Sequence, residues 1–416
     1  MKILIVSQYF WPENFLINDF SRKLAERGHE VTVATGKPNY PDGEIYNGYG
    51  LPGIQYETYS GNIEVIRVPI RPRGRGGAVD LALNYLSFVF SGLFNFPRLL
   101  RGREIDFIIV FAVSPITQAI PAVFLKWLKR AHLAIWVQDL WPESLSATGF
   151  VKKGPLLKLV GYMVRFIYSS SNTVLIQSRA FLDSVMSYSD SSKIVYFPNS
   201  IDSSTFVVEE SEIPIGLAHE IECCFSVVFA GNVGSAQAIE AIVSTAGLLK
   251  DNKDIKLFVI GSGSKLDWLK EQKELLGLSN LIVPGRFSAE SMPHLFRISS
   301  ALLVSLKDEP IFSLTIPSKV QAYLAAGRPI IASLGGEGAR VVQESGAGLV
   351  SPPEDPVSLA ANIKRLYEMA PEEREHMGQM GKLYFAKNFD MNLQVGRLID
   401  ILTSRSGYCV GEGGSG

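Results

Sequence analysis

The chain has 416 residues, 47% of them hydrophobic, and a net charge of −1 at pH 7. This length predicts two domains with buried cores, and the near-zero charge argues against a broad nucleic-acid surface, which is usually a basic domain. The three cysteines and five histidines show neither a disulfide framework nor the spacing of metal ligands, which fits a reducing cytoplasm.

The first half of the chain alternates apolar runs with helical patterns. Its opening residues, MKILIVSQYFWPEN, have too short an apolar run for a signal peptide, so we expect a strand there. Most of the runs are continuous in Val, Ile, Leu and Phe, which is typical of parallel strands covered on both faces. The predicted strands are 2–10, 30–36, 63–70, 106–113, 132–140, 172–178 and 193–199.

The second half repeats this alternation after an acidic, irregular stretch at 203–222, which we interpret as the connection between domains. Two such series predict two doubly wound α/β domains with ligands beyond the carboxyl ends of their strands, in a shared cleft. We place the first domain at 1–205, the second at 206–390, a helix that packs back on the first at 391–410, and a linker-like or tag-like tail at 411–416. The second set of strands is 225–232, 255–263, 280–287, 300–306, 328–333 and 348–353.

The loop GKPNYPDGEIYNGYG at 36–50 is long and rich in Gly, Pro, Asn and Tyr. Loops of this length inside compact domains tend to be functional. We expect the loop to lie near the cleft, and the alternative is a packed Ω-loop.

Residues 67–103 have a membrane-like composition. Four arginines, Arg67, Arg71, Arg73 and Arg75, precede an apolar stretch at about 81–97, which polar residues interrupt and Pro97 ends. This is marginal for a spanning helix, and an amphipathic segment in the interface of an anionic membrane fits better. A buried core helix is the alternative, and residues 156–169 are candidates for the same surface.

The block VQDLWPESLSATG at 137–149 ends a strand of the first domain. Asp139 and Glu143 flank Trp141, and carboxylates beside an aromatic face suit a sugar, through hydroxyl hydrogen bonds and ring stacking. The alternative is that Asp139 only caps the following helix.

Three strand ends of the second domain carry glycine turns or a cation. Gly231 to Gly234 follow the first strand, and Gly261 and Gly263 follow the next. Glycines allow a backbone to approach a phosphate at a helix N-terminus, although ordinary strand–helix turns look the same. Arg286 ends a third strand, where it either binds a diphosphate or forms a surface salt bridge.

The segment SLKDEPIFSLTIPSKVQAYLAAGRPIIAS at 305–333 is the most informative. Asp308 and Glu309 end a strand, and a helix starts at Pro317 with Ser318 and Lys319 in its first turn. A lysine there opposes the usual preference for acids at the positive end of a helix. An anion bound at the helix terminus would explain the misfit, and the alternative is that Lys319 is a solvated surface lysine.

Together these motifs resemble glycosyltransferase family 4 over essentially the whole chain. The resemblance is carried by SQYFWPEN, PNYPDG, QDLWPES, GNVGSAQ and PSKVQAYLAAGRPI. It extends to members that transfer N-acetyl-L-fucosamine in O-antigen assembly and, more distantly, to members of colanic acid synthesis.

The resemblance implies a GT-B fold, a UDP-sugar donor and an undecaprenyl-diphosphate-linked sugar acceptor at the cytoplasmic face of the bacterial inner membrane. It implies no cofactor and no metal, because basic side chains and a helix N-terminus stabilise the leaving diphosphate. We expect the nucleotide-sugar to contact Gly231, Asn232, Gly234, Gly261, Gly263, Arg286, Thr315, Pro317, Ser318 and Lys319. We expect the acceptor to contact Asn14, Asn39, Tyr40, Asp42, Trp141 and Glu143.

The catalytic candidates are Asp139, Arg286, Lys319 and Glu309. The chain departs from the family where Asn232 and, roughly, Gln237 replace a cationic pair, and where Ala322 replaces a glutamate that commonly holds ribose. Glu309 stands in for the second family glutamate. The alternatives are an epimerase of the same fold and a non-catalytic UDP-sugar-binding protein; a nicotinamide dehydrogenase is disfavoured because no Gly-x-Gly-x-x-Gly follows the first strand.

Overall fold

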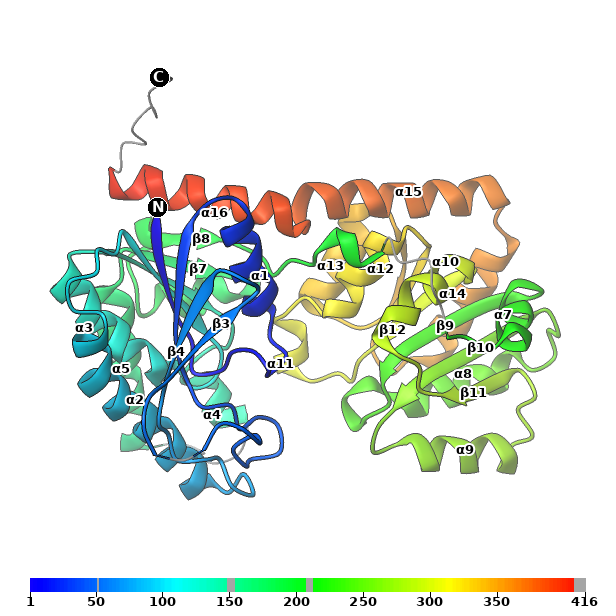
Figure 1. Ribbon diagram of the computed structural model, residues 1–416. Helices are drawn as coiled ribbons and strands as arrows, with labels where there is room; N and C mark the ends of the chain where they lie inside the picture. Colours follow the sequence, from blue (N-terminus) through cyan, green and yellow to red (C-terminus); the bar gives the residue numbers. More distant parts are fainter. Residues whose placement is uncertain (51, 148–153, 207–211, 408–416) are drawn as a thin grey trace. The chain divides into compact units, whose positions relative to one another are not determined.

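The computed structural model describes residues 1–50, 52–147, 154–206 and 212–407, and its chain forms two compact units (Figure 1). The first unit is Met1–Asn199 together with the segment that begins at Met391, and the second is Ser200–Asp390. The boundary between the units lies between Asn199 and Ser200, whereas the sequence analysis placed it between 205 and 206. It lies earlier because the short helix η4 (Ser203–Phe206) packs against helices of the second unit. The tail at 411–416 lies outside the described residues.

The first unit contains an eight-stranded sheet in the order β3-β4-β2-β1-β5-β6-β7-β8, with only β3 antiparallel to its neighbour. All seven expected strands are present, and β3 is an additional edge strand. The strands are β1 (Lys2–Val6), β2 (Glu30–Gly36), β3 (Gln55–Tyr59), β4 (Ile63–Val68), β5 (Phe107–Ala112), β6 (His132–Val137), β7 (Thr173–Ile176) and β8 (Ile194–Tyr196).

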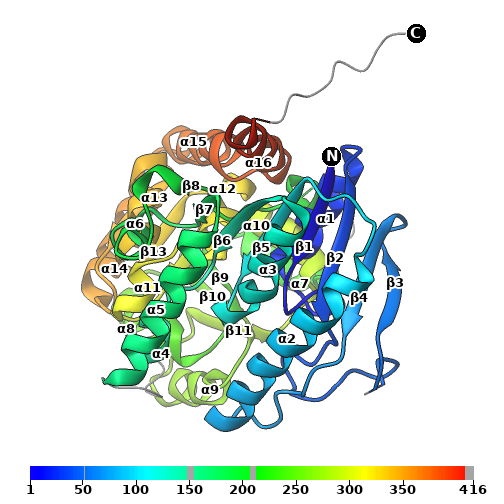
Figure 2. The same ribbon diagram turned by 90° about the vertical axis from the view of Figure 1, so that its left-hand side faces the viewer.

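Helices cover both faces of this sheet, which explains its continuous apolar strands. On one face, α1 and α16 share a core with the strands. On the other, α2, α3 and α5 lie side by side (Figure 2). The helices are α1 (Leu16–Glu26), α2 (Ala78–Leu99), α3 (Ala119–Lys129), α4 (Glu143–Ala147), α5 (Pro155–Ser170), α6 (Leu182–Met186) and α16 (Met391–Ser406), with short helices η1 (Ile116–Gln118), η2 (Arg179–Phe181) and η3 (Ser191–Lys193).

The sequence predicted that the apolar helix ends at Pro97. In the structure, helix α2 continues to Leu99. Proline lacks the N–H that would bond to the preceding turn. The helical bonding resumes directly afterwards, because the N–H of Leu100 donates to the carbonyl oxygen of Phe96 at 3.0 Å.

The second unit contains a six-stranded parallel sheet in the order β11-β10-β9-β12-β13-β14, and all six expected strands are present. Helices α8, α9 and α14 pack on one face, and α7, α10, α12, α13 and α15 on the other. The strands are β9 (Phe225–Asn232), β10 (Ile255–Ser262), β11 (Leu281–Gly285), β12 (Ala301–Ser305), β13 (Ile330–Ser333) and β14 (Gly348–Ser351). The helices are α7 (Ile215–Glu222), η5 (Ser235–Gln237), α8 (Ile239–Leu249), α9 (Leu266–Leu275), η6 (Ala289–Ser291), α10 (Met292–Ile298), α11 (Pro310–Ser313), α12 (Ser318–Ala326), α13 (Gly336–Ser345), α14 (Pro356–Glu368) and α15 (Pro371–Asn388).

Helix α7 corrects the expectation of an irregular connection at 203–222. Its Ile221 is fully buried, and Leu217 and Ala218 pack against the second core, so this part of the segment belongs to the second unit.

Each sheet reverses its strand order next to its first strand, between β1 and β5 in the first unit and between β9 and β12 in the second. Ligands of doubly wound sheets bind beyond the carboxyl ends of the strands at such a switch point. The strand orders therefore direct attention to the loops after β1, β5, β9 and β12.

Candidate active site

The carboxyl ends of β9 and β10 pack very closely in the second unit. A Cβ atom on Gly261 would lie 1.7 Å from the carbonyl oxygen of Gly231, and one on Gly263 would lie 2.4 Å from that of Val233. The close approach of the two strands therefore accounts for Gly261 and Gly263 without a ligand. Gly231 differs, because the space that a side chain would fill there is occupied by the side chain of Lys319.

Lys319 lies in the first turn of α12 and reaches the end of β9. Its Nζ is 3.6 Å from the centre of the Phe229 ring, and a Cβ atom on Gly231 would lie 2.8 Å from its Cε. The structure thus brings together two motifs that are nearly ninety residues apart in the sequence, as expected for a shared anion site.

The ammonium group of Lys319 is buried and has no hydrogen-bond partner among the described residues. Burial lowers its pKa from the usual 10.5 to about 7. Buried charges are normally paired. This cation is poised to gain a partner, and an anion at the switch point would supply one.

Tyr323, one turn after Lys319, was missed by the sequence analysis. Its hydroxyl accepts the N–H of Ala230 at 3.2 Å, and its side chain is fully buried. It therefore fastens α12 to β9 and fixes the position of Lys319. Its spacing of four residues from Lys319, which puts both on one helix face, is the signal that could have revealed it.

Other predicted donor residues lie at the same edge of the sheet. Arg286 follows β11, two strands from β9 in the sheet order, so at a strand spacing of about 4.8 Å it starts roughly 10 Å away. Its side chain is exposed and has no partner among the residues that the structure describes. Thr315, Pro317 and Ser318 lead into α12, and Glu309 is exposed at the start of α11.

The turn after β9 is held by its own side chains. Gln237, which the sequence comparison matched only roughly to a cationic position of the family, accepts the N–H of Gly234 at 3.1 Å. Asn232 is exposed at the strand end. Ala322, in place of the usual glutamate, packs against the core. Lys265 and Lys307 also adjoin this turn, because their N–H groups donate to Val233 and Ala236, and Lys319 differs from them in that its ammonium group is buried without a hydrogen-bond partner among the described residues.

In the first unit, Asp139 and Trp141 both bind the loop after β5. One oxygen of Asp139 accepts the N–H of Ser114 at 2.7 Å, and Trp141 Nε1 donates to the hydroxyl of Ser114 at 3.1 Å. Trp141 is only 7% exposed, so the expectation that its ring stacks on a sugar is wrong. Glu143 accepts a hydrogen bond from Ser184 at 2.5 Å on the surface.

The loop 36–50 is anchored by Asn39 and Glu13. Asn39 is fully buried, and its side-chain oxygen accepts the N–H of Arg73 at 3.0 Å, so it positions the loop and is not available to the acceptor, contrary to expectation. Asn14 and Asp42 are exposed, and Tyr40 is 39% exposed.

Glu13 is a second residue that the sequence analysis missed. Its buried carboxylate accepts the N–H groups of Asn39 and Tyr40, both at 2.8 Å, and that of Phe10 at 3.1 Å. Burial raises its pKa to about 7, which these three hydrogen bonds only partly offset. It joins two of the motifs quoted above, SQYFWPEN and PNYPDG, at the ends of β1 and β2.

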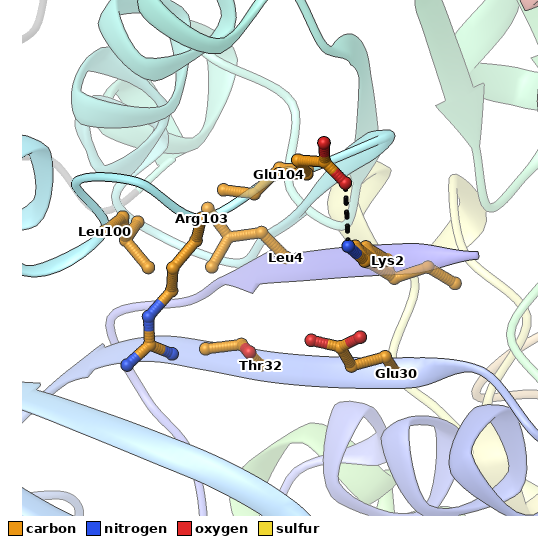
Figure 3. Close-up of a pocket in the computed structure, with 9 residues that line it drawn as sticks. Lys2, Leu4, Glu30, Thr32, Leu100, Arg103 and Glu104 are labelled. Carbon is orange, nitrogen blue, oxygen red and sulfur yellow. Dashed lines mark hydrogen bonds and ion pairs between the residues drawn. The ribbon is translucent and has the colours of Figure 1, made fainter.

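A small pocket lies at the opposite edge of the first sheet, where the strands begin (Figure 3). Lys2 and Glu104 form an exposed ion pair of 2.8 Å there, beside Glu30 and Arg103. Because doubly wound sheets bind ligands at the carboxyl ends of strands, this pocket is not the candidate active site.

Two family models match the chain. Residues 16–200 match the glycosyl transferase 4-like domain, and residues 225–384 match the glycosyl transferases group 1. Together they cover most of the chain, with one match in each unit.

Two curated relatives are similar over most of their length. A probable glycosyltransferase, WbjE of Pseudomonas aeruginosa, is 29% identical over 312 residues, which are 74% of this chain and 76% of WbjE. The putative colanic acid biosynthesis glycosyl transferase WcaI of Escherichia coli K12 is 23% identical over 339 residues, 79% of this chain and 82% of WcaI.

Solved structures share the fold. HepE of Anabaena in complex with UDP has a TM-score of 0.68 at 14% identity, covering 97% of this chain and all of HepE. Sucrose-phosphate synthase of Thermosynechococcus elongatus also has a TM-score of 0.68, at 16% identity, covering 97% of this chain and 99% of the synthase. The two doubly wound units are thus those of a GT-B protein, as predicted.

Proposed function

The chain belongs to the glycosyl transferases that its two matching family models describe, and we propose that it moves a sugar from a UDP-sugar to a lipid-diphosphate-linked sugar in the assembly of a bacterial surface polysaccharide. The second unit binds the donor and the first unit binds the acceptor. The observation that carries this proposal is the buried, unpaired ammonium of Lys319 beside Gly231, at the switch point of the second sheet.

Sugar transfer from a UDP-sugar leaves negative charge on the departing UDP. A preorganised cation at that position stabilises the transition state more than the ground state. Lys319 is preorganised, because Tyr323 fastens its helix to β9 and Phe229 packs against its ammonium group. Arg286 and the N-terminus of α12 add to the neutralisation, so no metal and no cofactor are required. HepE, which shares the fold, was solved with UDP and with UDP-glucose.

Asp139 is the proposed ligand or base for the acceptor hydroxyl. Its Oδ2 accepts the N–H of Ser114, while no hydrogen bond to its Oδ1 is found in the described part of the chain. A carboxylate held at one oxygen keeps the other available for a hydroxyl. The polysaccharide assignment is supported by the similarity to WcaI, and an N-acetylated amino sugar such as N-acetyl-L-fucosamine is proposed as the transferred group from the motif resemblance.

The first unit presents an apolar face suited to a membrane surface. Helix α2 is long and apolar enough to span a bilayer and little of it is buried; it lies beside α3, which in turn lies beside α5. Phe90 of α2 is 68% exposed, Trp127 of α3 is 57% exposed and Leu159 of α5 is 64% exposed. We assign this three-helix face to the cytoplasmic surface of the inner membrane, where the protein binds peripherally to anionic lipid.

The decisive test incubates a panel of nucleotide-sugars with a GlcNAc-diphosphate-lipid analogue and measures the products by mass. The proposal expects one UDP-sugar to add one sugar to the lipid, and expects Lys319→Met to abolish most of that product. A sugar nucleotide altered without any acceptor would indicate an epimerase. UDP binding without turnover on any lipid would indicate a non-catalytic protein.

A further inference from the structure

The guanidinium group of Arg73 in the first unit is oriented but not neutralised. It lies over the rings of Tyr40 and Tyr9, 4.9 and 5.8 Å from their centres. Within the described part of the chain no carboxylate pairs with it, whereas Arg71 pairs with Asp80 at 3.1 Å. Aromatic faces attract a cation but leave its N–H groups free to bind an anion.

The backbone around Arg73 is fixed by buried groups. Its N–H donates to the side chain of Asn39, and the N–H of Asn39 donates in turn to Glu13. The two tyrosine rings beneath it both pack on Phe15, with ring centres 5.4 Å apart in each pair. The cation therefore occupies a prepared position, which lowers the entropic cost of binding a ligand.

Arg73 shares its surroundings with Tyr85 and with Asp139, the proposed partner of the acceptor hydroxyl. Burial raises the pKa of Tyr85, while the Arg73 cation acts to lower it and the Asp139 carboxylate to raise it, so Arg73 and Asp139 each lie within electrostatic range of Tyr85. A cation and the proposed acceptor-binding carboxylate thus occupy one corner of the first unit, near the ends of the strands.

Tyr85 belongs to α2, which starts five residues after Arg73 and carries exposed apolar side chains from its first turn onward, among them Val79 and Leu86. A ligand with an apolar chain and an anionic head would find both partners here. The chain would lie along α2 and the head would reach Arg73. The planar guanidinium suits phosphate oxygens, which it binds in a bidentate manner.

We propose that Arg73 binds the diphosphate of the lipid-linked acceptor, so that the sugar attached to it faces Asp139. This inference rests on the proposed function and names the residue that recognises the acceptor. A nucleotide-sugar carries the same diphosphate chemistry. The acceptor is favoured because Arg73 belongs to the first unit and shortly precedes α2, the helix that contributes to the exposed apolar face.

The test uses calorimetry, in which the 416-residue chain, saturated with UDP, is titrated with geranyl diphosphate and, separately, with geranyl monophosphate. The wild type should bind the diphosphate at least about tenfold more tightly than the monophosphate, and Arg73→Gln should weaken the diphosphate on the order of ten- to a hundredfold. Arg101→Gln, an exposed arginine beyond the other end of α2, is the matched control and should change nothing. Arg73→Lys should give an intermediate loss, because a lysine keeps the charge without the planar fork.

The inference would be overturned if Arg73→Gln bound geranyl diphosphate as tightly as the wild type. It would also be overturned if Arg101→Gln lost the same affinity, which would indicate general surface charge. A matching loss of UDP affinity in a separate UDP titration of Arg73→Gln would assign Arg73 to the donor instead. Unchanged monophosphate binding with lost diphosphate binding would support the inference. If the protein binds geranyl diphosphate through Arg73 but transfers no sugar, the lipid site stands and the proposed function fails.

Discussion

Replacing Lys319 by methionine should move stability and donor binding in opposite directions. Methionine keeps the unbranched shape of the side chain and removes the buried ammonium group. Burying a polar group without a partner costs about 1–3 kcal/mol in proteins. The variant should therefore be more stable, with a thermal transition of the second unit higher by about 2–4 °C for each kcal/mol recovered. A more stable protein with lost function is the combination that a ligand-binding lysine predicts.

The same variant should lose affinity for UDP. A hydrogen bond to a charged group contributes about 1.5–3 kcal/mol, which corresponds to a rise in Kd of roughly ten- to a hundredfold. Turnover should fall further, by a factor on the order of 10² to 10³, because the charge on the leaving group is greatest in the transition state.

The pH dependence gives a sharper test. In the free protein the pKa of Lys319 is about 7, and a bound diphosphate should raise it, so binding takes up a proton above pH 7. The Kd for UDP should therefore rise with pH above about 7, by up to tenfold per unit. Measurements above pH 7 avoid the ionisation of the terminal phosphate, near pKa 6.

Stability follows the same linkage. The lysine of the unfolded chain, with a pKa of 10.5, stays protonated where the folded one is neutral. The loss of folding free energy caused by burying the charged lysine is thus complete below pH 7 and declines towards pH 10.5. The stability gain of Lys319→Met should therefore shrink between pH 7 and pH 10.5.

Calorimetry with UDP at pH 7, 8 and 9, together with thermal melts, measures all of these effects. Lys364→Met, which removes an exposed lysine of the same unit, is the matched control and should resemble the wild type. Wild-type UDP affinity in Lys319→Met, or the same pH dependence in both proteins, would refute the assigned role.

Three further predictions concern other described residues. Tyr323→Phe should cost about 1–3 kcal/mol in thermal unfolding, because the N–H of Ala230 loses its buried acceptor. The raised pKa of Glu13 means that its contribution to stability is complete below its usual pKa of 4.5 and declines as pH rises to about 7, a decline that melts of Glu13→Gln should lack. Phe90→Glu should weaken flotation with anionic liposomes at low salt. Leu275→Glu, which changes a similarly exposed residue of the second unit, is the control and should float like the wild type. Equal flotation of the two variants would contradict the three-helix membrane face.

The strands were predictable because they are buried on both faces, so their apolar residues run without interruption. Strand β3 escaped prediction because its sequence QYETY alternates at the sheet edge, where polar side chains face solvent. Helix α7 was not predicted because it lies in an acidic stretch. Its few apolar residues indicate a helix only once their packing against the core of the second unit is known.

The candidate site was predictable where one residue broke a local rule, as Lys319 did at the positive end of its helix. It was not predictable where burial decided the role. Trp141 and Asn39 have side chains suited to a sugar, but tertiary packing encloses both. The sequence placed Arg73 in a basic, membrane-like stretch, and its position over Tyr9 and Tyr40 depends on a loop that folds back from elsewhere in the chain.

The return of the chain to the first unit makes the second unit an insertion within it. Without α16, the first unit would expose the apolar surface that Met391, Val395, Leu398 and Leu402 cover, so residues 1–199 alone should aggregate. The two crossing segments run side by side, since the N–H of Ile201 donates to the carbonyl oxygen of Phe389 at 3.0 Å. A short glycine-rich bridge from Asn199 to Met391 should therefore replace the second unit and yield the first unit as a separately folded protein that stays in solution.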